Sequence, residues 1–120
     1  MSKQPLISYE RVEHETPRVL VYRLSGKLHG SPRCFEFLEA VRDDVRDGHR
    51  NVVIDFTGLN KMNSTGVGII AACFTSLRNA EGTLAISGTN DRIRMLMEVV
   101  CLWEMIRHHD TEDEAVAAFG

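Results

Sequence analysis

The chain has 120 residues, of which 43% are hydrophobic and 26% are charged, and its formal net charge is −3. This composition is typical of a globular domain that needs neither disulfides nor a metal to fold, and it differs from that of disordered chains. Its basic residues are scattered among acidic ones along the sequence. Nucleic acid is therefore not expected as the main partner, because phosphate binding needs a clustered basic surface.

The three cysteines, Cys34, Cys73 and Cys101, lie far apart in the sequence among apolar neighbours. No CxxC or Cys/His spacing is present, so we expect free thiols in the core and no bound metal or other cofactor. The N-terminus lacks the apolar core of a signal peptide, and the longest apolar run, 67–74, is far shorter than the roughly 20 residues of a membrane span. A soluble, cytoplasmic protein without membrane insertion is expected.

The first half of the chain shows alternating strand and helix patterns. Residues 7–12 and 19–24 are rich in β-formers and are predicted to be two strands joined by a turn. A helix is predicted over 31–47, since Ser31 is a candidate N-cap and apolar residues follow it at helical spacing. The short apolar run 51–56 is typical of a central strand that is covered on both faces.

The second half continues this alternation. Its predicted elements are a polar loop at 57–63, a helix at 64–80, a strand at 83–87, a helix capped by Asn90, an edge strand at 103–107 and a last helix capped by Thr111. The order ββαβαβαβα predicts an α/β fold with a mixed sheet of four to five strands and about four packed helices. The predicted core consists of Val21, Leu38, Val41, Val53, Ile54, Ile70, Phe74, Leu77, Leu84, Ile86, Leu96 and Val100.

The most informative segment, residues 57–68, follows the carboxyl end of the predicted central strand. Open α/β sheets place their functional sites at this end. The polar residues 63–65 can cap the helix that begins here, and Gly66 and Gly68 allow another surface to approach the backbone. Simple helix capping is the alternative interpretation of these residue types.

Residues 66–71, Gly-Val-Gly-Ile-Ile-Ala, also match the G-x-G-x-x-A pattern of dinucleotide-binding helices. In those proteins the pattern follows its strand at once, and an acidic residue comes roughly 20 positions later. Here about ten residues separate Phe56 from Gly66, and residues 87–89, Ser-Gly-Thr, stand where the acidic residue is expected. A nucleotide or other small-molecule site is therefore the weaker alternative.

No set of residues in the sequence assembles a nucleophile, a base and an oxyanion site. His14, His29 and His49 are isolated, which is more typical of exposed loops than of a catalytic base. Ser64 lacks the G-x-S-x-G turn of a hydrolase, and Asp55, without a second carboxylate, more typically caps a turn. The sequence thus predicts a protein that is not an enzyme.

Two consecutive motifs carry a resemblance to a known family. Residues 53–59, Val-Ile-Asp-Phe-Thr-Gly-Leu, and 62–68, Met-Asn-Ser-Thr-Gly-Val-Gly, resemble the signature of STAS domains, especially the bacterial anti-sigma factor antagonists. Residues 24–28, Leu-Ser-Gly-Lys-Leu, resemble the upstream L-x-G-x-L element, and residues 81–84 match the gap before the strand that follows the central helix. The ordered set covers the chain from about Ile7 to Phe119.

The resemblance implies a single STAS domain over residues 1–120 that acts as a protein-binding switch and catalyses nothing. Unphosphorylated members bind an anti-sigma factor with serine-kinase activity; this kinase phosphorylates the serine that matches Ser64, and a phosphatase resets the switch. Thr65 is the second choice as phosphoacceptor. The implied partner-binding surface consists of Lys27, His29, Lys61, Met62, Asn63, Ser64, Thr65, Gly66, Val67 and Gly68.

Two positions depart from the family pattern, because His29 and Asn63 stand where acidic residues are usual. An unphosphorylated docking or scaffold subunit, of the stressosome or lipid-transport type, is therefore an alternative. The identity of the helix cap also matters. If Asn63 is the N-cap, Ser64 projects outward, and if Ser64 is the cap, it is half engaged but still at the exposed tip. Thr65 is expected to be stiffer and more packed.

Overall fold

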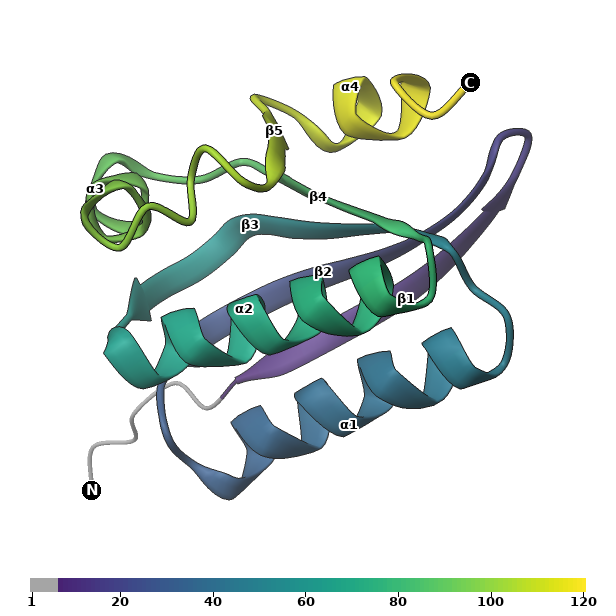
Figure 1. Cartoon of the computed structure of the whole chain (residues 1–120). Coiled ribbons are helices and arrows are strands. Elements are labelled where there is room, and N and C mark those ends of the chain that lie inside the picture. The colour runs from purple at the N-terminus through teal and green to yellow at the C-terminus, as the bar shows by residue number, and fades with distance from the viewer. Residues whose placement is uncertain (1–6) are drawn as a thin grey trace.

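The computed structural model describes residues 7–120 and shows a five-stranded mixed sheet with the order β1-β2-β3-β4-β5 (Figure 1). The elements are β1 (Ser8–Glu15), β2 (Arg18–Leu28), α1 (Pro32–Arg46), β3 (Asn51–Met62), α2 (Ser64–Asn79), β4 (Thr83–Ser87), α3 (Asp91–Val99), β5 (Arg107–His109) and α4 (Glu112–Ala117). β1 is antiparallel to β2, and all other neighbouring strands are parallel. The predicted order of elements and fold class are confirmed.

β3 is the central strand, and its side chains alternate between two separate cores. Val52, Ile54 and Phe56 belong to the main core, to which α1 and α2 contribute, whereas Val53 belongs to a smaller core with Ala115 of α4. In Figure 1, α1 and α2 cover one face of the sheet, and α4 lies on the other. A strand covered on both faces needs apolar residues in succession, which explains the continuous run in the sequence.

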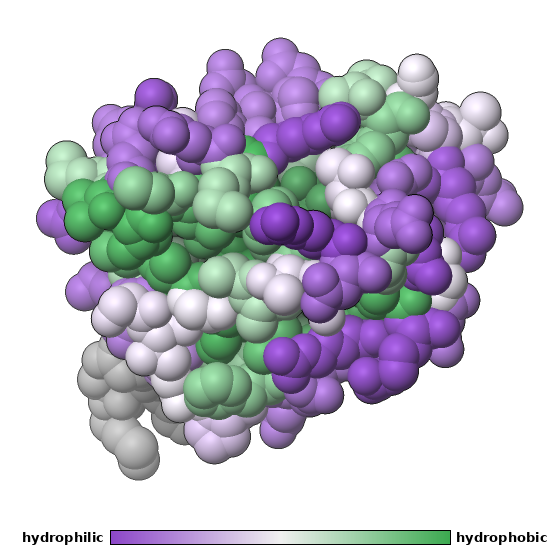
Figure 2. Space-filling view, viewed as in Figure 1, coloured by the Kyte–Doolittle hydropathy of each residue, from purple (hydrophilic) through white to green (hydrophobic). Residues whose placement is uncertain are grey.

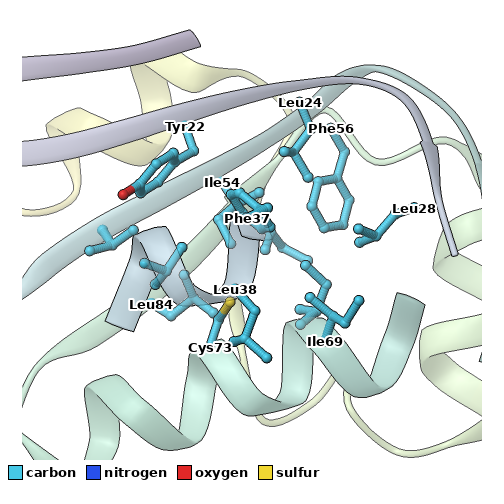
Figure 3. Packing of buried hydrophobic residues seen from close by; sticks show 14 of the residues in the cluster. Tyr22, Leu24, Leu28, Phe37, Leu38, Ile54, Phe56, Ile69, Cys73 and Leu84 are labelled. Atoms are coloured by element: carbon cyan, nitrogen blue, oxygen red, sulfur yellow. The ribbon is translucent and has the colours of Figure 1, made fainter. Parts of the chain in front are cut away.

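The main core is filled by side chains from β2, β3, β4 and the two long helices. Figure 3 shows Tyr22 of β2, Phe37 of α1 and Cys73 of α2 pointing into the space between sheet and helices. Nine of the predicted core residues are buried, and Phe74 and Leu96 are half-buried at its margin.

Val100 is a wrong core prediction, since it is 47% exposed. α3 ends at Val99, and the chain then reverses through Cys101, whose φ of 63° is in the left-handed region. The apolar stripe of α3 therefore stops before Val100. Cys101 is itself exposed, whereas Cys34 and Cys73 are buried, so the core prediction was wrong for one cysteine of the three.

The predicted polar loop at 57–63 is largely strand. β3 continues to Met62 because β2 also continues past Leu24, and residues 25–28 pair in parallel with residues 58–62. Hydrogen bonds to a neighbouring strand hold this polar stretch extended, and a hydropathy pattern does not report them. The edge strand also lies later than predicted, at Arg107–His109. Within residues 7–120, no helix combines the length and the apolar character needed to cross a membrane.

Candidate functional site

The candidate site lies at the carboxyl ends of the parallel strands β2, β3 and β4. Parallel strands end at the same edge of a sheet, so the β2–α1 turn, the start of α2 and the start of α3 are brought together. Figure 1 shows the first turns of α1 and α2 and the whole of α3 at this end of the molecule. Residues far apart in the sequence thus share one edge.

Asn63 is the N-cap of α2. Its backbone is extended, its Oδ1 accepts a hydrogen bond from the Gly66 N–H at 2.9 Å, and its carbonyl accepts from the Val67 N–H at 3.0 Å. Ser64 is therefore the first helical residue, and its hydroxyl is not the capping group. Ser64 and Thr65 are both exposed, so Thr65 is not packed away as expected, and exposure does not distinguish the two hydroxyls.

Gly66 allows α2 to begin directly against the end of β2. A Cβ atom at this position would lie 2.2 Å from the Leu28 carbonyl oxygen and 2.7 Å from Met62 Cγ. Gly66 and Val67 are buried, so both pack inside the domain. They are therefore not part of an exposed partner-binding surface, contrary to the prediction. At Gly68, which is exposed, a Cβ would meet no atom within 4 Å.

This local geometry also bears on the nucleotide alternative. The Gly66 N–H, which a phosphate at the helix start would need, is already bound by Asn63, and the Leu28 carbonyl fills the space beside it. A carbonyl oxygen repels phosphate oxygens, since both carry negative charge. Gly66 is therefore explained by helix packing and does not favour a nucleotide site.

The β2–α1 turn lies beside the first turn of α2. His29 Nδ1 accepts a hydrogen bond from the Ser31 N–H at 3.2 Å, and a Cβ on Gly30 would lie 3.5 Å from the Thr65 methyl carbon. Lys27 and Lys61 are register partners on β2 and β3. The structure thus brings the predicted residues of β2, its following turn and β3 to one edge.

The site contains few negative charges, although the whole chain is slightly acidic. No carboxylate occurs between Glu15 and Glu36 or between Asp55 and Glu81, and these stretches supply β2, the end of β3 and all of α2. The first turns of α1 and α2 contain no acidic residue either. The partial positive charge at the N-termini of α1 and α2 is therefore not offset by an acidic residue of the first turn, whereas α3 has Asp91 in its first turn.

Arg92 at the start of α3 is a site residue that the sequence interpretation missed. It lines a cavity of about 220 Å³ together with Asn60, Lys61, Met62 and Ile93. The sequence could have predicted this position, because a helix that follows a parallel strand begins at the same edge of the sheet as α2. The exposed residues of the first turn of α3 could have been added on that ground.

Asp55 has a structural role in the sheet. Its carboxylate accepts hydrogen bonds from the Ser87 hydroxyl at 2.7 Å and from the Thr57 hydroxyl at 3.0 Å. It therefore ties β3 to β4 and holds the bulge of β3 at Thr57. Asp55 lies within β3 and not before a turn, so its interpretation as a turn cap was wrong.

A second cavity, of about 430 Å³, contains none of the predicted site residues. Its walls include Trp103 and His108, whose rings stack with centroids 3.9 Å apart. Burial, together with the nearby Arg94, lowers the pKa of His108. Over residues 7–120, the structure contains no group of three or more His, Cys, Asp or Glu side chains that could hold a metal ion.

The main electrostatic network of the core is distinct from the site. Asp44 accepts two hydrogen bonds from Arg11, at 2.7 and 3.0 Å, and one from the buried Tyr22 hydroxyl. His49 Nε2 lies 3.3 Å from Arg11 Nη2, and His49 is only 8% exposed, so its expected place in an exposed loop was wrong. Burial alone would raise the pKa of Asp44, but the bonds from Arg11 and Tyr22 outweigh it and hold this pKa below its ordinary value.

Stability should decrease in acid because of this network. The Arg23 hydrogen bonds likewise lower the pKa of Glu112, so both carboxylates stabilise the fold above the pKa values of the unfolded chain, 3.8 and 4.5. That contribution is lost as the pH falls below about 4.5 and through the folded-state values. Asp44→Asn should cost about 1 to 3 kcal/mol at neutral pH, and the deficit should shrink towards acid pH.

Urea unfolding across the acid range measures this effect. Asp43→Asn, an exposed change on the same helix, is the matched control and should follow the wild type. An unchanged pH slope in Asp44→Asn would contradict the assigned role of Asp44.

Comparison with known proteins identifies related sequences over most of the chain. Residues 11–115 match the STAS domain family. The anti-sigma-B factor antagonist of Listeria monocytogenes is 31% identical over 112 residues, which are 90% of this chain and 93% of the relative. The anti-sigma-B factor antagonist of Staphylococcus aureus is 31% identical over 86 residues, or 70% of this chain and 77% of that protein.

Solved structures show the same fold. An anti-sigma factor antagonist from Mycobacterium paratuberculosis superimposes with a TM-score of 0.82 at 22% identity, covering 98% of this chain and 97% of that one. Unphosphorylated SpoIIAA gives a TM-score of 0.72 at 22% identity, with 95% and 97% coverage. Anti-sigma factor antagonists are non-enzymatic regulators, in agreement with the prediction that this protein is not an enzyme. From its matched sequence and its five-stranded mixed sheet with four helices, the chain belongs to the STAS domain family.

Proposed function

We propose that this chain is a cytoplasmic anti-sigma factor antagonist whose binding to an anti-sigma factor is controlled by phosphorylation of Ser64. The observation that carries the proposal is the position of Ser64. It is exposed and is the first residue of α2, and its hydroxyl does not cap the helix because Asn63 does. The relatives named anti-sigma-B factor antagonists support the class of partner. The partner would be an anti-sigma factor with serine-kinase activity, and a phosphatase would reverse its action.

The fold should tolerate a phosphate at Ser64. Phosphorylation adds roughly −1.5 to −2 charges, and the dipole of a helix N-terminus stabilises an anion there. The absence of carboxylates from residues 56–80 means that little repulsion opposes it. SpoIIAA supports this view, since its unphosphorylated and phosphorylated structures superimpose on this chain with TM-scores of 0.72 and 0.68.

The partner, in contrast, should not tolerate the phosphate. A partner surface that fits a neutral hydroxyl would bury an uncompensated charge when Ser64 is phosphorylated. Switches of this kind typically change affinity by about 5- to 150-fold, or 1 to 3 kcal/mol. Phosphorylation would therefore release the partner without altering the fold of this domain.

Variants of Ser64 and Thr65 test the proposal. The anti-sigma factors of the source organism would be purified, and their binding to the wild type, Ser64→Ala, Ser64→Asp and Thr65→Ala would be measured by calorimetry. We expect Ser64→Ala to bind like the wild type and Ser64→Asp to bind several-fold more weakly, because it places a negative charge at the contact. After incubation with ATP, mass spectrometry should find phosphate on Ser64 in the wild type and in Thr65→Ala.

Two results would decide against the phosphorylation switch. Equal binding of Ser64→Ala and Ser64→Asp, together with phosphorylation of Ser64→Ala, would move the modification to another residue. Tight binding with no phosphorylation of the wild type by any partner would instead support the constitutive docking or scaffold subunit.

A further inference from the structure

The cavity of about 220 Å³ between the end of β3 and the first turn of α3 lies close to the start of α2, because Met62 lines it and also packs beside Gly66. Lys61, on one wall, precedes Ser64 by three residues. Met62, on the same strand, lies against Gly66 in the first turn of α2. Any protein that covers Ser64 from this side would therefore also meet the cavity.

Two cationic side chains flank this cavity. Lys61 and Arg92 are exposed, and neither forms an ion pair with another residue of the 7–120 range. Asp91, the carboxylate nearest to Arg92 in the sequence, lines the cavity of about 430 Å³ together with Arg94. Two cations without a counter-charge beside one concave site favour an anionic occupant.

Apolar groups complete the site. Ile93, which is buried, and Met62, which is half-buried, also line the cavity. Arg92, Met95 and Val99 follow one another at i, i+3 and i+7, and so lie on one face of α3. Met95 is 65% and Val99 is 74% exposed, and Figure 2 shows apolar surface gathered over α3. Arg92 therefore borders a strip of exposed apolar surface.

We infer that this cavity and the adjoining face of α3 bind an acidic side chain, Asp or Glu, that is flanked by apolar residues on the partner protein. The inference rests on the proposed function and specifies the chemistry of the partner. A nucleic acid would match the cations but would leave Met95 and Val99 in water. An anionic membrane would meet the exposed carboxylate of Glu98 on the same helix. A protein segment with a carboxylate and apolar neighbours matches both parts of the surface.

The same cations connect recognition to the switch. A phosphate on Ser64 places about two negative charges three residues from Lys61, where the partner's carboxylate binds. The phosphate attracts the same cations and repels that carboxylate. Binding and phosphorylation are thus mutually exclusive through one set of charges.

Charge reversal tests the inference with the purified anti-sigma factors. Lys61→Glu and Arg92→Glu should each weaken binding at least about tenfold, since each adds a repulsive charge at the carboxylate contact. Arg78→Glu is the control, because it makes the same charge reversal at an exposed position in the last turn of α2. Its affinity for the partner should stay within about twofold of the wild type. Wild-type affinity should fall as NaCl is raised from about 50 to about 300 mM. Unchanged affinity in both site variants would overturn the inference.

A second probe makes the test independent of the proposed function. The peptide acetyl-Leu-Glu-Glu-Leu-amide would be titrated into the ¹⁵N-labelled chain, with its Gln-Gln counterpart as the matched control. Chemical-shift changes at residues 60–62 and 92–93, seen only with the Glu peptide and lost in the Lys61→Glu, Arg92→Glu double variant, would support the inference even if no anti-sigma factor binds. Equal changes with both peptides, or none, would overturn it. Tighter binding there of a short thymidine oligonucleotide or of phosphatidylglycerol vesicles would overturn it as well.

Discussion

Replacing Ile70 with Ala should lower the free energy of unfolding by about 2 to 5 kcal/mol. Ile70 lies in the middle of α2 and is fully buried in the main core between this helix and the sheet. Truncation removes apolar contacts and leaves a cavity that the surrounding strands cannot fill by moving. Urea unfolding followed by circular dichroism measures the loss, and the urea dependence should stay the same if unfolding remains two-state.

An exposed residue provides the control for Ile70. Val99→Ala, at the end of α3 and 74% exposed, should change stability by no more than about 0.5 kcal/mol. A loss below about 1 kcal/mol for Ile70→Ala would mean that α2 presents a different face to the sheet. Because Ile70 points away from the candidate site, the folded fraction of this variant should bind the partner like the wild type.

Gly66→Ala and Gly68→Ala should change stability in opposite directions although they lie two residues apart on one helix. At Gly66 the new methyl group would collide with the backbone carbonyl of Leu28, which cannot rotate away, so we expect a loss of about 1 to 3 kcal/mol. At Gly68 the methyl group meets open space, and Ala favours the helix over Gly by roughly 0.5 to 1 kcal/mol. The same urea experiment compares the two variants.

The two glycine variants should also differ in their affinity for the partner. A shift of the first turn in Gly66→Ala would displace Ser64 and the Asn63 cap, so binding should weaken even in fully folded protein. Gly68→Ala adds only an exposed methyl group and should leave the cap intact. If both variants were equally stable, α2 would not begin against β2 in the way the structure shows.

The local patterns of the sequence determined much of the fold. The apolar run at 51–56 identified the central strand, because only a strand covered on both faces needs apolar residues in succession. Helical spacing identified the buried faces of α1 and α2, including Ile70. Asn63 and Ser64 were recognised as the start of a helix because capping depends on residues close together in the chain.

The tertiary structure decided what depends on neighbours distant in the sequence. The strand beyond Asp55 exists because β2 pairs with it, and the burial of His49 depends on Arg11 from β1. The choice of Asn63 over Ser64 as cap depends in part on the Leu28 carbonyl, which accepts the Asn63 N–H at 3.3 Å. Local sequence patterns do not reveal contacts between residues that are far apart in the chain.

The candidate site divides in the same way. The sequence by itself placed Lys61 and Ser64 beyond the carboxyl end of the central strand, because the loop and the helix start that contain them come next in the chain. It could not place Arg92 beside Lys61, because Arg92 comes 30 positions after Met62 and only the parallel pairing of β3 and β4 brings their ends to one edge. Basic residues that look scattered along the chain therefore gather at one cavity, because the sheet aligns the strand ends from which they project.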